Sequence, residues 1–179
     1  MKRFLVVLLM GGLVLCGWSI YSLQPQPIEK FETAVDLVQY WSKTEYPSYI
    51  CGVFVKSQSH DKTVITFGIT DDEMGRAGRD EILTLIRDKS TAFFVTQKYT
   101  YAQMLSAKED LMSYLTSHFE LLGEWSLGIR QSENYIYVNL LENEKNLDAI
   151  EHFKNETYEK YGDMIHFGVG KPGEGLSFD

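Results

Sequence analysis

The sequence predicts an α+β fold in which an N-terminal membrane leader helix precedes two β-β-α-β halves joined by a long central helix. Extended runs rich in Val, Ile, Phe and Tyr alternate with segments of helical period. The stretch 49–72, YICGVFVKSQSHDKTVITFGITDD, contains a Gly, an extended run, a polar break and a second extended run, and residues 126–143 repeat this plan. We expect a supersecondary duplication whose half-sheets bury their apolar faces together with the long helix across them. One shared core and two sub-domains both stay open.

Residues 1–22, MKRFLVVLLMGGLVLCGWSIYS, predict a signal peptide or membrane anchor, because two basic residues precede the apolar run 4–20. Three fates stay open. The run is short for an uncleaved anchor, Gly17-Trp18-Ser19 offers a small-x-small cleavage site, and LVLC resembles a bacterial lipobox with Cys16 as the lipidated residue, although Leu15 replaces its usual small residue. Each fate places the remainder at the extracytoplasmic face of the cell membrane, or secreted if the leader is cleaved.

Residues 23–48 are interpreted as a linker and a first helix, and residues 49–99 as the first β-β-α-β unit. The helical spacing in the first helix predicts one inward face, formed by Ile28, Phe31, Val35 and Val38. Within the unit, a hairpin across SQSHD is followed by a short buried helix over 80–89 and a strand over 91–99.

Residues 100–122 predict the connecting helix, which begins with a Thr100–Gln103 capping box and stops at Gly123. Its inward face is predicted to hold Tyr101, Met104, Leu105, Leu111, Met112, Leu115 and Phe119.

The second β-β-α-β unit is predicted over 123–170, with a hairpin across 132–134, a helix that ends at Gly162 and a last strand. Residues 171–179 are predicted to form a flexible tail. The second-unit helix is predicted to turn inward Leu147, Ile150, Phe153 and Tyr161.

Composition indicates a globular chain that avoids polyanions. Of 179 residues, 44% are hydrophobic and 23% charged, which is ordinary for a folded domain. The leader holds two of the 17 basic residues and none of the 25 acidic ones, so the remainder has a net charge of −10. Such a charge repels nucleic acid and anionic lipid surfaces.

Cys51 is the one cysteine outside the leader, so no internal disulfide is expected. It is interpreted as a small buried strand residue.

The segment TDDEMGRAGRD is the best candidate for a polar ligand site. Asp71, Asp72 and Glu73 could hold a cation. Arg76 and Arg79, with Gly75 and Gly78, could cradle a phosphate or carboxylate at a helix N-terminus. A plain helix start with acids in its first turn explains the same residues.

A partner-binding role is the second candidate, for aromatic residues that precede the two hairpins: Trp41, Tyr46, Tyr49 and Trp125. Core packing explains them as well as a peptide groove does. An open sheet edge could also accept an extended chain by strand addition.

No catalytic residue, metal ligand or cofactor is predicted. The four histidines are scattered without metal-ligand spacing: His60, His118, His152 and His166.

The second copy resembles a module of secreted or membrane-anchored Gram-positive bacterial proteins of unknown function. The pattern GIxxxxNxIxV spans Gly128 to Val138, and a Lys/Glu-rich helix and a strand with FxxG, Phe167 to Gly170, follow it. The first copy, with YPSYICGVFV, resembles β-β-α-β units of the pro-regions of alpha-lytic-type serine proteases, except that Cys51 stands in place of a Gly. The resemblance implies a binding module without catalysis.

These observations predict an extracytoplasmic, membrane-tethered binding or adaptor protein, with an envelope protein or peptide as partner. The alternative is a cell-envelope hydrolase that uses the Asp71–Arg79 loop. A structural lipoprotein without a small ligand is a third possibility. The oligomeric state stays open.

Overall fold

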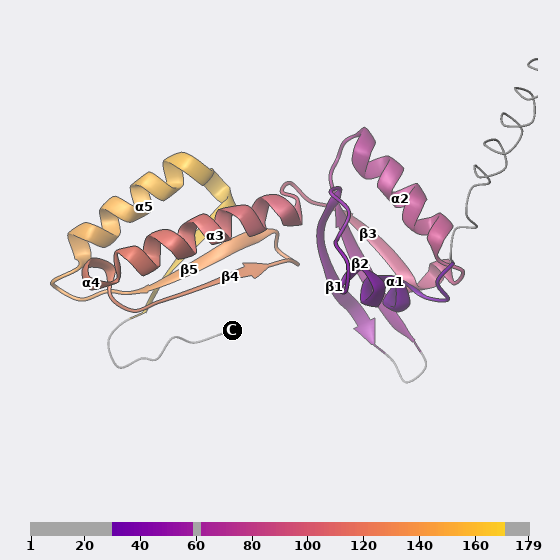
Figure 1. Cartoon of the computed structure of the whole chain (residues 1–179), viewed down its shortest axis with the longest axis horizontal. Helices are drawn as coiled ribbons and strands as arrows, with labels where there is room; N and C mark the ends of the chain where they lie inside the picture. The colour runs from indigo at the N-terminus through magenta and orange to yellow at the C-terminus, as the bar shows by residue number, and fades with distance from the viewer. Residues whose placement is uncertain (1–29, 59–61, 171–179) are drawn as a thin grey trace, which may run out of the picture.

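The computed structural model describes residues 30–58 and 62–170, which form an α+β fold of five helices and two three-stranded sheets. Figure 1 shows two lobes, a first lobe over 30–96 and a second over 101–170. No helix in these ranges is long and apolar enough to span a bilayer. The predicted leader with Cys16, the hairpin tip with His60 and the tail lie outside the described residues.

The first lobe is a sheet in the order β1-β2-β3, in which β1 and β2 are antiparallel and β2 and β3 are parallel. Its elements are α1 (Ala34–Trp41), β1 (Ile50–Gln58), β2 (Thr63–Ile69), α2 (Glu73–Leu85) and β3 (Ala92–Thr96). The helices α1 and α2 contribute to one apolar core, and Phe67 of β2 lies fully buried within it.

The second lobe has the same strand order and directions, β4-β5-β6. Its elements are α3 (Tyr101–Ser117), α4 (Phe119–Leu122), β4 (Trp125–Arg130), β5 (Tyr135–Leu141), α5 (Leu147–Tyr161) and β6 (Ile165–Gly170). Figure 1 shows α3 and α5 on the same side of this sheet. The two lobes have separate apolar cores, so the expectation that the half-sheets bury their apolar faces together is wrong. Helices of the same lobe cover each sheet.

The predicted face of the first helix is confirmed in part, because Val35 and Val38 pack against the core and are partly buried, while Ile28 lies outside the described residues. A capping box between Thr33 and Asp36 starts α1 at Ala34, and the residues buried most deeply are Ala34, Leu37 and Trp41. Phe31 lies before the helix in an extended bridge, where its N–H donates to the Leu85 carbonyl over 2.8 Å. The apolar spacing in the sequence therefore grouped Phe31, which is extended, with Val35 and Val38, which belong to the helix.

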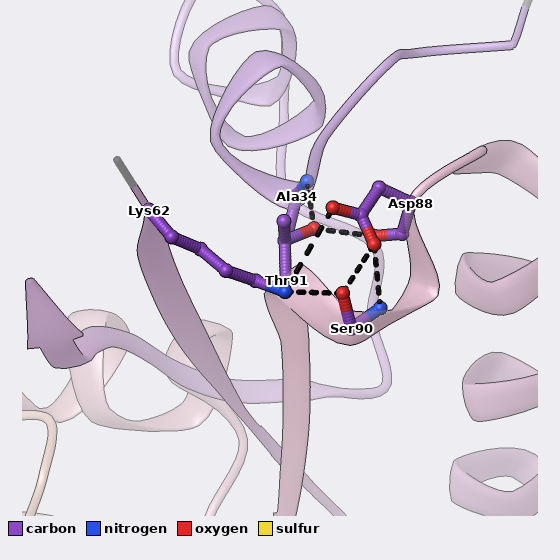
Figure 2. A network of polar contacts seen from close by, with 5 residues as sticks. All are labelled: Ala34, Lys62, Asp88, Ser90 and Thr91. Carbon is purple, nitrogen blue, oxygen red and sulfur yellow. Dashed lines mark hydrogen bonds and ion pairs between the residues drawn. The ribbon is translucent and has the colours of Figure 1, made fainter. Parts of the chain in front are cut away.

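A polar network fastens the start of α1 to the turn before β3 (Figure 2). The Ala34 N–H donates to Thr91 Oγ1 over 2.9 Å, and the Thr91 hydroxyl donates to the Asp88 carbonyl over 2.6 Å. The Asp88 carboxylate accepts from the Ser90 N–H over 3.0 Å and lies 3.9 Å from the Lys62 ammonium. These contacts satisfy a backbone donor that the helix start leaves unpaired.

The second helix is longer than predicted. It begins at Glu73 rather than Asp80 and ends at Leu85, because Asp72 caps it by accepting from the Gly75 N–H over 2.8 Å. The segment interpreted as the Asp71–Arg79 loop is therefore mostly the first two turns of α2, as the alternative of a plain helix start implied.

The central helix begins at the predicted Thr100–Gln103 capping box, which is confirmed. His118 separates α3 from the short α4, and Gly123 and Gly162 end α4 and α5 as predicted, with φ values of 77° and 56°. Three of the seven residues predicted to face inward from the connecting helix are exposed: Leu105, Met112 and Phe119. Leu147, predicted to face inward from the second-unit helix, is exposed as well.

Candidate functional site

The outer edge of β4 is an open sheet edge in the described residues, as are the outer edges of β3 and β6. Six consecutive residue pairs join β4 to β5 without a register shift, and no other described strand pairs with β4. The edge strand β1 differs, because register shifts at Ile50/Gly52 and Val55/Ser57 interrupt it. Bulges and charges are the usual protection against pairing with another chain, and β4 carries only Arg130, at its end.

The backbone pattern shows which groups face outward. The Leu141 N–H donates to the Glu124 carbonyl over 3.0 Å, so this pair is hydrogen-bonded across the strands. Hydrogen-bonded and non-hydrogen-bonded pairs alternate along an antiparallel ladder. The outward N–H and C=O groups of β4 therefore belong to Trp125, Leu127 and Ile129.

The side chains of these three residues face the core of the second lobe but remain only half-buried. The residues that face the same core from β5 are all 0% exposed: Ile136, Val138 and Leu140. A strand placed beside β4 would complete this burial and pair the outward backbone groups.

Helix α3 extends this edge with apolar side chains. It contacts β4, whereas α5 contacts β6. Leu105 and Met112, 37% and 45% exposed, are seven residues apart and lie on the flank of α3 opposite the one that faces α5 with Asp110 and Tyr114. We call the outer edge of β4 together with Leu105 and Met112 the β4 ledge.

The predicted partner-binding aromatics do not form one cluster. Trp41 and Tyr49 belong to the first-lobe core, and Tyr46 packs on Trp41 with 6.1 Å between ring centroids. Tyr46 also contacts Tyr101 of α3 at 5.7 Å. Trp125 alone lies on the β4 ledge. The spacing along the chain therefore grouped residues from two separate cores.

Tyr49 has a buried hydroxyl with no hydrogen-bond partner among the described residues. Burial, followed by the nearby negative charge of Glu81, raises the pKa of this phenol. Its ring packs directly on Gly78 of α2. Tyr49 therefore joins β1 to α2 and is not presented to a partner.

The predicted ligand residues are exposed just before α2 and in its first two turns, and they do not converge. The Asp72 carboxylate accepts from the Gly75 N–H and from the Thr70 hydroxyl over 2.7 Å, which lowers the pKa of its carboxyl group. The Arg79 guanidinium lies over the Phe94 ring, 5.3 Å from its centroid. Asp71 and Arg76 are exposed.

The glycines of this segment allow close packing. A Cβ at Gly75 would lie 2.0 Å from the Thr70 carbonyl oxygen, and one at Gly78 would lie 2.4 Å from the Tyr49 ring. Both positions need glycine because another part of the chain fills the side-chain space. This explains them without a bound phosphate.

A polar junction between the lobes was missed by the sequence reasoning. Asn134, in the β4–β5 turn with φ 61°, accepts from the N–H groups of Lys98 and Tyr99 and donates to the Tyr99 carbonyl, all within 2.9 Å. The Gln97 side chain donates to the Gln131 carbonyl over 2.7 Å. The only available signal was the turn-forming tendency of Asn, which indicates a left-handed residue but not its long-range partners.

The same junction explains a pair of glycines in the first sheet. The Gln97 amide lies over Gly68, where a Cβ would come within 1.8 Å of its Oε1 atom, and Gly52 faces the Gln131 carbonyl. The Gln131 side chain accepts from the Val53 N–H over 2.7 Å. The β4–β5 turn of the second lobe thus packs against the backbone of the first sheet at Gly52 and Gly68, where no side chain intervenes.

The described histidines have local partners. His118 stacks on Tyr114, His166 stacks on Tyr135 with 3.9 Å between centroids, and His152 lies 3.3 Å from a Glu156 oxygen. Among residues 30–58 and 62–170, no group of three or more His, Cys, Asp or Glu side chains could hold a metal ion.

Cys51 is fully buried in β1, as expected for a small strand residue. Burial, with a smaller contribution from the Asp72 charge, raises the pKa of its thiol from 9.0 to about 11. The thiolate is the reactive form, so at pH 8 its population falls about 100-fold relative to an ordinary thiol. We expect iodoacetamide to leave the Cys51 peptide unmodified in the native protein and to alkylate it in denaturant, as read by mass spectrometry. Rapid native alkylation would contradict this assignment.

Comparison with known proteins gives no family assignment: the chain matches no known family model and no curated protein. The resemblance to Gram-positive envelope proteins and protease pro-regions stays a prediction.

Proposed function

We propose that this chain is an extracytoplasmic, membrane-tethered module that binds an extended segment of an envelope protein or peptide by strand addition at the β4 ledge. The observation that carries the proposal is the contrast between β4 and β5. Side chains of both strands face one core, yet those of β4 are only half-buried, next to an outer backbone edge that no described strand pairs.

The ledge selects a partner by alternation. Every second side chain of an added strand faces α3, so these positions favour apolar residues that cover Leu105, Met112 and Ile129. The intervening side chains lie on the helix-free face of the sheet, next to Arg130 and Tyr137, where the guanidinium lies 5.3 Å from the ring centroid. Backbone hydrogen bonds contribute affinity, and the alternation contributes specificity.

The tether follows from the predicted leader. Either the retained residues 1–22 or a lipidated Cys16 holds the module at the membrane. The net charge of −10 in the remainder opposes adsorption to anionic lipid. Cleavage of the leader instead releases the same binding module.

The hydrolase alternative receives less support. Hydrolysis needs a nucleophile or base within hydrogen-bond reach of its partner in a cleft. In the Asp71–Arg79 segment, Asp72 is used as a helix cap and Arg79 covers Phe94. Neither residue is poised against a second catalytic group in the described structure.

Charge on the β4 ledge should weaken partner binding without unfolding the protein. The double substitution Leu105→Glu and Met112→Glu places carboxylates where the partner's apolar residues must be buried, so we expect binding at least about tenfold weaker, since burying an unpaired charge is costly. The probe is a displayed library of twelve-residue peptides selected on the full chain, with affinities then measured for individual peptides. We expect the selected peptides to alternate apolar and polar residues.

The matched control is Tyr158→Glu on α5, because Tyr158 is also apolar and is 65% exposed, but it lies on the helix farther from β4. It should leave peptide affinity unchanged. Equal loss in both variants, or selected peptides without alternation, would contradict strand addition at β4. In the native cells, a photo-crosslinking residue at Met112 should capture an envelope protein that one at Tyr158 does not. Mass spectra of the same samples identify the mature N-terminus.

A further inference from the structure

A cavity of about 260 Å³ lies between α3 and α5, on the flank of α3 opposite the β4 ledge. Leu111, Phe153 and Thr157, each at most 4% exposed, form its inner wall. The ring of Tyr114 stacks on Phe153 with 5.1 Å between centroids and contributes to the side wall. The interior is therefore lined mainly by hydrocarbon and aromatic groups.

Two carboxylates stand at the rim on different helices, Asp110 on α3 and Glu156 on α5. The Tyr161 hydroxyl donates to Asp110 over 3.0 Å, and the Tyr114 hydroxyl donates to Glu156 over 3.4 Å. Donated hydrogen bonds stabilise the ionised form, and those from Tyr161 and Lys160 lower the pKa of the Asp110 carboxyl group. The rim thus presents fixed negative charge above an apolar interior.

The contacts of Lys160 show that the rim can hold an ammonium group. Its ammonium lies 3.2 Å from an Asp110 oxygen and 4.8 Å from the centroid of the Tyr161 ring. Its side chain is 62% exposed, so only part of its surface is held by the protein. An exposed ion pair of this kind is weak, and another cation can replace it.

We propose that this cavity binds an alkylammonium ion, with the hydrocarbon chain against Leu111 and Phe153 and the ammonium at the carboxylate rim. Asp110, Glu156 and Lys160 together give the lining a net charge of −1. A cation that displaces Lys160 meets the two carboxylates alone, with a charge of −2. An alkyl carboxylate would meet two like charges, and a neutral alcohol would gain only the apolar contact. The site uses no residue of the β4 ledge and is independent of the proposed function.

The test compares three probes of equal chain length, n-hexylammonium, 1-hexanol and hexanoate, by NMR titration of the full chain. We expect hexylammonium to bind most tightly and hexanoate least, with the largest shifts at Leu111, Tyr114 and Phe153. A blocked lysine, Nα-acetyl-lysine N-methylamide, distinguishes the two sources of this group. If it competes with hexylammonium, the ligand is a lysine side chain of a protein; if it does not, the ligand is a free amine.

Charge variants separate binding in this cavity from general attraction to an acidic protein. Glu156→Gln should weaken hexylammonium binding about threefold, and Lys160→Met should strengthen it about threefold, the range expected for exposed ion pairs. Glu151→Gln removes the same charge from an exposed position of α5 outside the cavity and should change nothing. The proposal fails if hexanoate binds as tightly as hexylammonium, if no cavity resonance shifts, or if Glu151→Gln and Glu156→Gln act alike.

Discussion

Replacing Asn134 with Ala should lower the free energy of unfolding by about 3 kcal/mol, since it removes three hydrogen bonds to backbone at the junction between the lobes. The Asn134 side chain accepts from the N–H groups of Lys98 and Tyr99 and donates to the Tyr99 carbonyl, and it is 9% exposed. Alanine also tolerates the left-handed φ of 61° less well than Asn.

Urea denaturation measures this loss, with Trp41 and Trp125 as reporters in separate cores. Glu133→Ala, an exposed position of the same turn, should change the free energy of unfolding by less than about 0.5 kcal/mol. Asn134→Gly avoids the backbone strain but also lacks the side-chain hydrogen bonds. Its loss in the free energy of unfolding should therefore lie between those of Glu133→Ala and Asn134→Ala. If Asn134→Ala is as mild as Glu133→Ala, the amide does not hold the lobes together.

Replacing Gly75 with Ala should lower the free energy of unfolding by about 3 kcal/mol, although Ala normally stabilises a helix by about 1 kcal/mol relative to Gly. The added Cβ would lie 2.0 Å from the Thr70 carbonyl oxygen. That oxygen belongs to the backbone that joins β2 to α2, and the Thr70 hydroxyl bonds the cap residue Asp72. Relief of the clash therefore requires the helix start to move.

Thermal and urea unfolding check this result against Ala77→Gly, an exposed position of the same helix. Ala77→Gly should lower the free energy of unfolding by about 1 kcal/mol, the difference in helix propensity between Ala and Gly. If Gly75→Ala instead stabilises the protein, the glycine is not needed for packing, and the alternative that Gly75 serves a bound anion regains support.

Signals between near neighbours in sequence were sufficient for much of the fold. Thr100 and Gln103 cap α3, Gly123 and Gly162 end helices, and alternating β-branched and aromatic residues define the strands. Capping and turn geometry depend on hydrogen bonds across three or four residues, so a single sequence contains them. The α+β class and the order of the elements follow from these local preferences.

The surfaces were decided by tertiary structure. Helical spacing placed Leu105 and Met112 inside, but the sheet beneath α3 covers only the stripe through Met104 and Leu111. Nothing local shows that β5 is central and β4 an edge, or that Asn134 reaches Lys98 and Tyr99 across the junction. The width of a buried face and the partners of a polar side chain depend on residues distant in sequence, whose positions only the assembled chain establishes.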